Sequence, residues 1–460
     1  MTPSGKARVP PHDPTRAASL LPGVPCPGAA LALSFGVLLA ACPAPRGPSA
    51  PSIAAQTLEI GRAGAVLSGV AGNAAMVFAA LATAQPARTT IAAFPPGATS
   101  AAPAWRTELD GAGGPLASSG GTLVAALGGT GAAAGLALRG EPGAAVVALD
   151  AATGAVTWKL AIDATEWSVI AALAAAPDGV LVGGSFAGTL RIGARVVSSA
   201  GKADGFIARL TAAGGVAWLV RLGGPGADAV QGVAAAGDRI AIAGTFAAGA
   251  DLLGQPLPPF DDRSPNADGF VAELDATGAR RWAQTFGGKA DDAVAGVAID
   301  AHGRIAVAAS ARETVHVGGD DLVASGPADG LVAWWAPGGA AGPATLLGGV
   351  DFDGLRAITA AGDHMLVAGF YSGALRLGAR ALTAGGGDDA FVAELDASGS
   401  VVQAWPVGGD GREEITALAA VPGGFIAGIA HTAAATFGDA ALPAPADPLS
   451  GAAVVVRPVR

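Results

Sequence analysis

The sequence predicts an all-β fold built from repeated four-stranded units, and three observations support this prediction. One segment occurs four times, beginning at Asp204, Asp268, Asp329 and Asp389, at steps of 64, 61 and 60 residues. Each copy is followed by two short apolar runs separated by Gly, Asp, His or Pro, as in a tight hairpin of buried strands. Gly also interrupts the alanine-rich runs, which are therefore too short for amphipathic helices. A period of this size is typical of stacked supersecondary units.

Each unit contains four expected strands, which we call a to d in chain order. In one clear copy, strand a is AVQGVAA from Ala229, b is RIAIAG from Arg239 and c is GFVAELD from Gly269. Four-stranded units repeated radially form a β-propeller. Small residues suit strand a because the innermost strands crowd together at the axis. Strand d carries a Trp shortly before a Gly-Gly pair, and we expect it to pack between neighbouring blades; these residues are Trp158, Trp218, Trp282 and Trp405.

The two ends of the chain indicate how the ring closes. Weaker copies at 144–186 and 74–129 precede the clear ones, whereas the C-terminus offers only one strand after 425–431, from Ala452. The missing strand d occurs at the start of the chain, where AQTLEIG at 55–61 aligns with AQTFGGK from Ala283. The sequence therefore predicts a seven-bladed β-propeller whose last blade is closed by an N-terminal strand. Closure would remove exposed sheet edges.

The repeat resembles a known family of propeller repeats. The order W, GG, D, GVA, G.I.VAG.F and DGFVAELD.TG is similar to the SBBP-type β-propeller repeats of large exported bacterial proteins. The resemblance is clear over residues 144–431 and fainter outside them. It implies a propeller fold and an exported or surface location, but no reaction.

A weaker resemblance concerns ALDAATGAVTW at 148–158. This segment is similar to the A.D..TG...W docking motif of PQQ-type quinoprotein propellers, and residues 275–282 resemble it with one residue fewer. In that family the motif ties blades together. Its enzymes also carry calcium ligands and paired cysteines, which we do not find here, so we expect no cofactor. Two alternatives stay open: a quinoprotein-like dehydrogenase or lyase that uses the channel mouth, and a propeller lipoprotein of the outer-membrane assembly type.

The first 54 residues predict export and a lipid anchor. Basic residues precede an apolar core at 28–41, which is too short to span a bilayer and is typical of a signal peptide over residues 1–41. The ending LAAC resembles the bacterial lipobox, which implies that Cys42 is lipidated and becomes the mature N-terminus; the alternative is an ordinary signal with a chance cysteine. Pro43, rather than Asp, follows the cysteine, which in such lipoproteins implies location in the outer membrane. Residues 42–54 then form a Pro-rich tether before the propeller at 55–460.

The charge of the chain restricts its partners. The formal net charge is -10, and it becomes about -12 when Lys6, Arg8, Arg16 and Asp13 leave with the signal peptide. Nucleic acid and anionic membrane surfaces are therefore unfavourable partners. The acyl anchor would hold the protein at the membrane instead. We expect no disulfide, because the only other cysteine, Cys26, lies in the signal peptide.

Acidic residues recur four positions after each Gly-Gly pair, just before strand a. Equivalent positions in a closed ring are expected around one mouth of the axial channel. One interpretation is that each carboxylate caps N–H groups of its turn, as Asp commonly does. The other is an acidic ring that binds a cation or a cationic ligand. The four residues are Asp228, Asp292, Asp353 and Glu413.

The remaining polar residues predict no catalytic site. The histidines show no metal-ligand spacing, and we interpret His302 and His364, which share a turn position between strands a and b, as solvated residues; the others are His12, His316 and His431. No nucleophile with a matching base is evident, although a triad can assemble from distant loops.

The longest connections join strands b and c, and variable loops on a rigid scaffold are common binding sites. Their ranges are 247–267, 311–328, 372–388 and 432–450. We therefore expect a non-catalytic, lipid-anchored module that binds or scaffolds a cell-envelope component, with the enzyme as the competing class.

Overall fold

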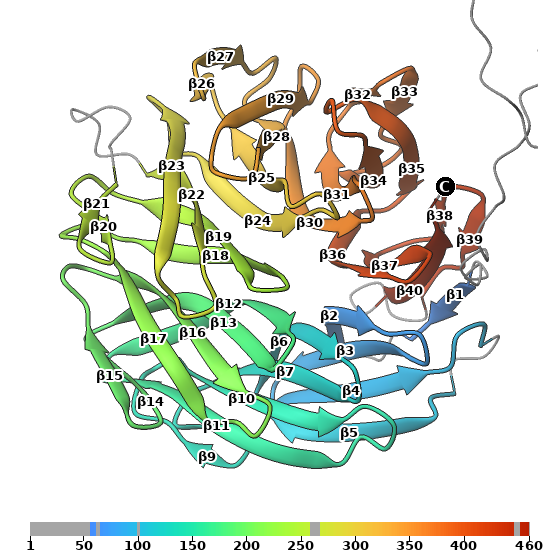
Figure 1. The fold of residues 1–460 in the computed structure, drawn as a ribbon. Coiled ribbons are helices and arrows are strands. Elements are labelled where there is room, and N and C mark those ends of the chain that lie inside the picture. The colour runs from blue at the N-terminus through green and yellow to red at the C-terminus, as the bar shows by residue number, and fades with distance from the viewer. Residues whose placement is uncertain (1–55, 61–64, 99–101, 258–266, 446–450, 460) are drawn as a thin grey trace, which may run out of the picture. The chain divides into compact units, whose positions relative to one another are not determined.

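A computed structural model describes residues 56–60, 65–98, 102–257, 267–445 and 451–459. These residues form seven four-stranded blades arranged in a ring (Figure 1), so the predicted seven-bladed all-β propeller is confirmed. The described part of the chain contains no helix that is long and apolar enough to cross a membrane. The predicted signal peptide, Cys42 and the tether lie outside the described residues.

The strands of each blade follow one another from the axis outward, in the order a, b, c and d. They are β2 (Ala65–Gly72), β3 (Val77–Ala84), β4 (Ala87–Phe94) and β5 (Trp105–Asp110) in blade 1; β6 (Ala112–Ser119), β7 (Thr122–Gly129), β10 (Gly143–Asp150) and β11 (Val156–Ala164) in blade 2; β12 (Trp167–Ala176), β13 (Gly179–Ala187), β16 (Asp204–Thr211) and β17 (Val216–Gly223) in blade 3; β18 (Ala229–Ala236), β19 (Arg239–Phe246), β22 (Asp268–Leu274) and β23 (Arg280–Gly288) in blade 4; β24 (Ala293–Ile299), β25 (Ile305–Ala311), β28 (Asp329–Trp335) and β29 (Ala341–Leu347) in blade 5; β30 (Asp353–Ala361), β31 (His364–Tyr371), β34 (Asp389–Leu395) and β35 (Val401–Gly409) in blade 6; and β36 (Glu413–Val421), β37 (Gly424–His431), β40 (Gly451–Pro458) and β1 (Gln56–Glu59) in blade 7.

Blade 7 is composite, as the sequence predicts. Strand β1 pairs antiparallel with β40, with Thr57 opposite Val455 and Leu58 opposite Val454. On its other side β40 pairs with β37, so the sheet order is β1-β40-β37-β36. The first described strand of the chain therefore supplies strand d of the last blade.

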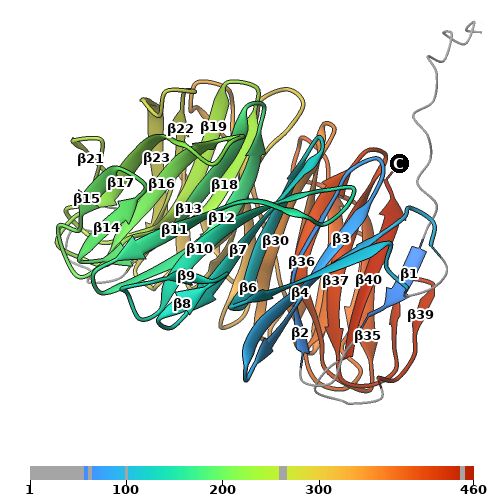
Figure 2. The same cartoon turned by 90° about the horizontal axis from the view of Figure 1, so that it is seen from below.

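Antiparallel pairing sorts the connections onto two faces. Figure 2 shows the strands crossing the thickness of the ring, so that turns gather at both ends of the blades. Because neighbouring strands run in opposite directions, the a-to-b and c-to-d turns share one face. The b-to-c and d-to-a connections share the other face.

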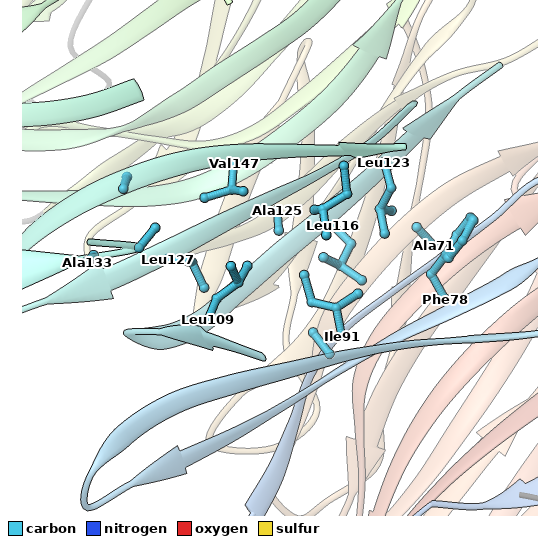
Figure 3. Packing of buried hydrophobic residues seen from close by; sticks show 14 of the residues in the cluster. Ala71, Phe78, Ile91, Leu109, Leu116, Leu123, Ala125, Leu127, Ala133 and Val147 are labelled. Atoms are coloured by element: carbon cyan, nitrogen blue, oxygen red, sulfur yellow. The ribbon is translucent and has the colours of Figure 1, made fainter. Parts of the chain in front are cut away.

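The core consists of seven apolar clusters, each placed between two neighbouring blades. Figure 3 shows the cluster in which Phe78 and Ile91 of blade 1 meet Leu116 and Leu123 of blade 2. Another cluster joins blade 7 to blade 1 and contains Leu58 of β1. Burial of apolar area at these interfaces is therefore the main stabilising contribution to the ring.

Tryptophans of strand d also join neighbouring blades, as expected. The indole N–H of Trp158 donates to the carbonyl oxygen of Ala212 in the next blade at 2.8 Å, and Trp218 donates to Ala276 at 3.0 Å. The turn that receives Trp158 contains Gly214, which has a φ of 81°. A Cβ at this glycine would lie 2.8 Å from the indole, so only glycine fits. The A.D..TG...W segment thus makes a blade-to-blade contact in this chain.

Several b-to-c connections form hairpins that the sequence did not predict. Each of these hairpins pairs with strand d of the preceding blade and extends its sheet to six strands. The long connections are thus partly structural, and 258–266 and 446–450 lie outside the described residues. The extending hairpins are β14 (Thr189–Ile192) with β15 (Arg195–Ser198), β20 (Asp251–Leu252) with β21 (Gln255–Pro256), β26 (Thr314–Val317) with β27 (Asp320–Val323), and β38 (Ala435–Phe437) with β39 (Ala440–Leu442); β32 (Ala374–Leu377) with β33 (Arg380–Thr383) and β8 (Ala132–Ala133) with β9 (Leu136–Ala137) form separate two-stranded sheets.

Closure by β1 can be tested with Leu58→Asp. Leu58 is 2% exposed in the cluster between blades 7 and 1, so a carboxylate there would be buried without a partner. We expect the free energy of unfolding to fall by about 4 kcal/mol or more, with aggregation through the freed edge of β40. Val323→Asp, at a 66% exposed strand position, is the matched control in thermal and denaturant unfolding. Equal melting of both variants would contradict closure by β1.

Candidate functional site

The four recurrent acidic residues are buried beside the d-to-a turns. Asp353 and Glu413 begin strands β30 and β36, whereas Asp228 and Asp292 immediately precede β18 and β24. Their exposed fractions are 2% for Asp228, 4% for Asp292 and 0% for the other two. The structure therefore buries these side chains rather than exposing them around the channel mouth.

Two of these carboxylates cap their own turns. Asp228 accepts hydrogen bonds from the backbone N–H of Gly224 at 2.8 Å and of Ala247 at 2.9 Å. Asp353 accepts one from the N–H of Gly349 at 2.6 Å. Both carboxylates thus fix the Gly-Gly turn that leads from strand d to strand a, which is the turn-cap interpretation.

Sequence reasoning missed the partner of each acidic residue. A second buried acid opens strand c of the same repeat and lies against it across the Gly-Gly turn. In blade 3, a Cβ at Gly223 would lie 2.7 Å from Cγ of Asp204 and 2.8 Å from Oδ2 of Asp228, so both carboxyl groups lie against this glycine and a side chain there would not fit. The D that opens each DGF, DGL or DAF segment was the available signal. The pairs are Asp204 with Asp228, Asp268 with Asp292, Asp329 with Asp353, and Asp389 with Glu413.

Among the described residues, the pair at Asp204 and Asp228 is the one with an arginine beside it on strand d. The guanidinium of Arg221 lies 2.5 Å from Oδ2 of Asp204. Arg221 is opposite Phe206 in its strand pair. In the other three repeats the same register position lacks a positive charge, and it holds Thr285, Leu346 and Pro406.

The pairs without arginine retain a proton more readily. Burial, and then the charge of Asp268, raise the pKa of Asp292 to about 7. Burial and Asp329 raise the pKa of Asp353 to about 6. Burial and Asp389 raise the pKa of Glu413 to about 7. A hydrogen bond from the backbone of Arg312 opposes this rise at Asp292, and one from the backbone of Gly409 opposes it at Glu413. Two adjacent buried carboxyls cannot both be charged without cost. Asp292 and Glu413 are therefore partly protonated near neutral pH, and Asp353 only at slightly lower pH.

The axial channel is divided into two cavities of 410 and 280 Å³. Both are lined by strands a of all seven blades, and seven aliphatic side chains belong to both linings. These side chains form a constriction at the axis. They are Val70, Leu116, Leu173, Val233, Val297, Ile358 and Leu418.

Ionisable side chains are sparse in both cavities, and the uncharged polar side chains of the smaller one are Ser68, Gln231 and Thr416. Apart from the constriction, the larger cavity is lined mainly by alanine, with the hydroxyls of Ser118 and Thr359. Among the described residues that line either cavity, Arg356 is the one that carries a charge. Its Nε lies 3.5 Å from Oε1 of Glu414, and its guanidinium lies 4.8 Å from the ring centre of Phe370. The lining thus offers no carboxylate or imidazole for proton transfer.

The histidines have structural contacts. His316 contacts Asp321, and Nδ1 of the buried His431 lies 2.9 Å from the carbonyl oxygen of Ala433. His364, interpreted from the sequence as a solvated turn residue, is only partly exposed: it begins β31 directly after that turn, and its Nδ1 lies 2.6 Å from Oε1 of the buried Glu394. Throughout the described ranges, no group of three or more His, Cys, Asp or Glu is arranged to hold a metal ion.

Comparison with known proteins finds only distant structural similarity. No family model matches the chain, and no curated protein matches it. BamB from Moraxella catarrhalis is similar at 15% identity and a TM-score of 0.43, covering 85% of each chain. A europium-containing methanol dehydrogenase is 14% identical with a TM-score of 0.38, covering 86% of this chain and 93% of that one. The β-propeller domain of the Trilobed protease from Pyrococcus furiosus is 9% identical with a TM-score of 0.44, covering 86% and 95%. At these values the similarity bears on no residue or activity of this chain.

The carboxyl pairs predict that stability falls as pH rises. Between about pH 4 and pH 7 the folded protein holds protons on Asp292, Asp353 and Glu413 that the unfolded chain has released, so the free energy of unfolding decreases with pH. Hydrogen bonds from its two arginine neighbours outweigh burial and lower the pKa of Glu273 to about 2, so Glu273 acts in the opposite sense only at lower pH. We expect denaturant unfolding to show less stability at pH 8 than at pH 5.

The variant Asp292→Asn separates this effect from general charge repulsion. It removes one titrating group. We therefore expect it to raise the free energy of unfolding by about 1–3 kcal/mol more at pH 8 than at pH 5. Asp320→Asn, at an exposed position on β27, is the matched control. A stability of the wild-type protein that does not change between pH 5 and pH 8 would exclude shared protons at these pairs.

Proposed function

We propose that this chain is an exported, lipid-anchored β-propeller that binds or scaffolds another protein of the cell envelope without catalysing a reaction. The observation that carries the proposal is the lining of the axial channel. A propeller enzyme of the quinoprotein or lyase class would need acid–base or metal-binding groups there. The two cavities instead present alanine, aliphatic side chains, a few hydroxyl and amide side chains, and one arginine that is engaged with Glu414.

Residues suited to protein binding lie beside the channel, on the face of the d-to-a turns. Phe352 is 44% exposed, and its ring centre lies 5.6 Å from that of Phe370. Arg356 lies over the same Phe370 ring, and Val350 nearby in the chain is 74% exposed. Aromatic residues and arginine dominate binding energy at protein interfaces. This cluster supports a binding role for the face that the sequence analysis also favoured.

The localisation part of the proposal rests on the LLAAC segment that ends at Cys42. Cys42→Ala should abolish incorporation of labelled fatty acid and release the protein from the membrane fraction. Cys26→Ala, within the predicted signal peptide, is the matched control and should leave acylation intact. Unchanged labelling of the Cys42→Ala protein would exclude the lipid anchor.

The binding part is tested by crosslinking in cells followed by affinity capture. We expect a specific envelope protein to be recovered with the wild-type chain, and its recovery to fall about tenfold or more with Phe352→Ala combined with Arg356→Ala. Val323→Ala, exposed on β27, is the control and should not change recovery. Equal recovery with the double variant, in a protein that melts normally, would remove this face from the interface.

A further inference from the structure

A cavity of 230 Å³ lies in the groove between blades 2 and 3. It adjoins the contact through which Trp158 of β11 docks on the c-to-d turn of blade 3. The apolar side chains of Val124, Val180 and Trp158 form part of its wall, and Thr122 and Thr211 add hydroxyl groups. Ala117 and Ala175 of two strands a line both this cavity and the larger axial cavity, so the groove adjoins the channel. No charged residue is among the described residues that line it.

Other blades fill the corresponding groove with their own charged side chains. In blade 4, Arg239 at the start of strand b pairs with Glu273 of strand c at 2.6 Å. The same guanidinium donates to the carbonyl oxygen of Gly303 in blade 5 at 2.6 Å, so it spans the groove. In blade 6, His364 and Glu394 form the corresponding pair at 2.6 Å.

Blade 2 has small residues at both of these positions. Thr122 is opposite Ser119 at the a-to-b turn, as Arg239 is opposite Ala236. On strand c, Ala148 is opposite Trp158, which is the register of Glu273 opposite Trp282. The groove between blades 2 and 3 is thus open because two space-filling side chains of the repeat are missing.

A carbonyl group in this groove has an unused acceptor position. In the next groove, the carbonyl oxygen of Ala276 accepts both the indole N–H of Trp218 at 3.0 Å and the guanidinium of Arg209 at 3.1 Å. The equivalent oxygen of Ala212, among the described residues, accepts only the indole of Trp158, at 2.8 Å. Arg209 occupies the strand c position that Ala148 has in blade 2, because each lies opposite the docking Trp.

From these comparisons we propose that the groove binds the side chain of an arginine from a partner protein. The alkyl stem packs on Val124, Val180 and Trp158, and the guanidinium donates to the free position on Ala212 and to the hydroxyls of Thr122 and Thr211. Lysine fits less well, because its compact ammonium is more strongly hydrated and lacks the planar set of donors that reaches several acceptors at once. The net charge of -10 favours the approach of a basic partner. That the arginine belongs to a protein rests on the proposed function. That the groove binds a guanidinium group does not rest on it.

Ligand-observed NMR with N-acetyl-arginine amide tests the chemistry directly. We expect saturation transfer to this probe with an affinity in the millimolar range, since one side chain supplies few contacts. N-acetyl-lysine amide and methyl glucoside are the comparison probes, and we expect at least tenfold weaker binding of each. Stronger binding of either comparison probe, or no binding of the arginine probe, would overturn the assignment.

The variant Thr122→Arg places an arginine at the position of Arg239 and should occupy the groove itself. We expect it to lose at least tenfold in affinity for the arginine probe, whereas Thr436→Arg, exposed on β38, should not. Trp158→Phe identifies the Trp158 indole N–H resonance by its loss. In the wild-type protein this resonance should shift with the arginine probe while the other indole signals stay, which tests the site even if Thr122→Arg folds poorly. An unshifted Trp158 resonance would exclude the groove.

The same variants separate this proposal from the proposed function. Suppose that the arginine probe binds but Thr122→Arg leaves capture of the envelope partner unchanged. The groove then binds a guanidinium but does not contribute to that interface, and its assignment to a partner arginine fails. If no envelope partner is captured at all, the proposed function fails while the probe measurements still decide the chemistry of the groove.

Discussion

Apolar packing between neighbouring blades is the interaction on which the rest of this structure depends. A single four-stranded blade cannot bury both of its faces, so each one relies on the blades on either side. The ring satisfies all seven interfaces only if the last is closed, and Leu58 of β1 contributes to that closing cluster. The N-terminal strand is short, yet without it β40 would present an unpaired edge and the cluster between blades 7 and 1 would lose one wall.

Close packing also explains where polar groups are tolerated. The Gly-Gly turn brings two carboxyl groups together in each of four repeats, because no side chain separates Asp204 from Asp228 or their equivalents. A positive charge stabilises such a pair, and Arg221 supplies it in one repeat. Where Thr285 stands in place of the arginine, burial and the neighbouring Asp268 raise the pKa of Asp292 to about 7, so stability depends on pH. The turns that connect the blades therefore also hold the carboxyl groups whose titration affects stability.

The repeat made the fold predictable from the sequence, whereas side-chain contacts between repeats could not be predicted. Strand positions and the composite blade followed from the alignment of 55–61 with Ala283, because equivalent residues recur in order. The hairpins such as β20–β21 were missed because two-residue strands show no periodicity. The acidic positions were found, but not their burial or their partners, since Asp204 and Asp228 meet only through folding. Likewise, the groove beside Trp158 depends on residues from strands that lie far apart in the chain.

In a ring of near-identical units, features shared by all blades serve the fold, so specific binding must come from positions where one blade differs. The aliphatic constriction of the channel recurs in every blade and therefore explains packing rather than recognition. Arg356 and Phe352 differ from their counterparts and are exposed at the face of the d-to-a turns. Thr122 and Ala148 differ in the opposite way, because they remove side chains that neighbouring blades use to fill a groove. Without a charged side chain of its own, the groove keeps a carbonyl acceptor and an apolar wall. Their arrangement indicates that an arginine side chain from another protein can take the place of the missing one.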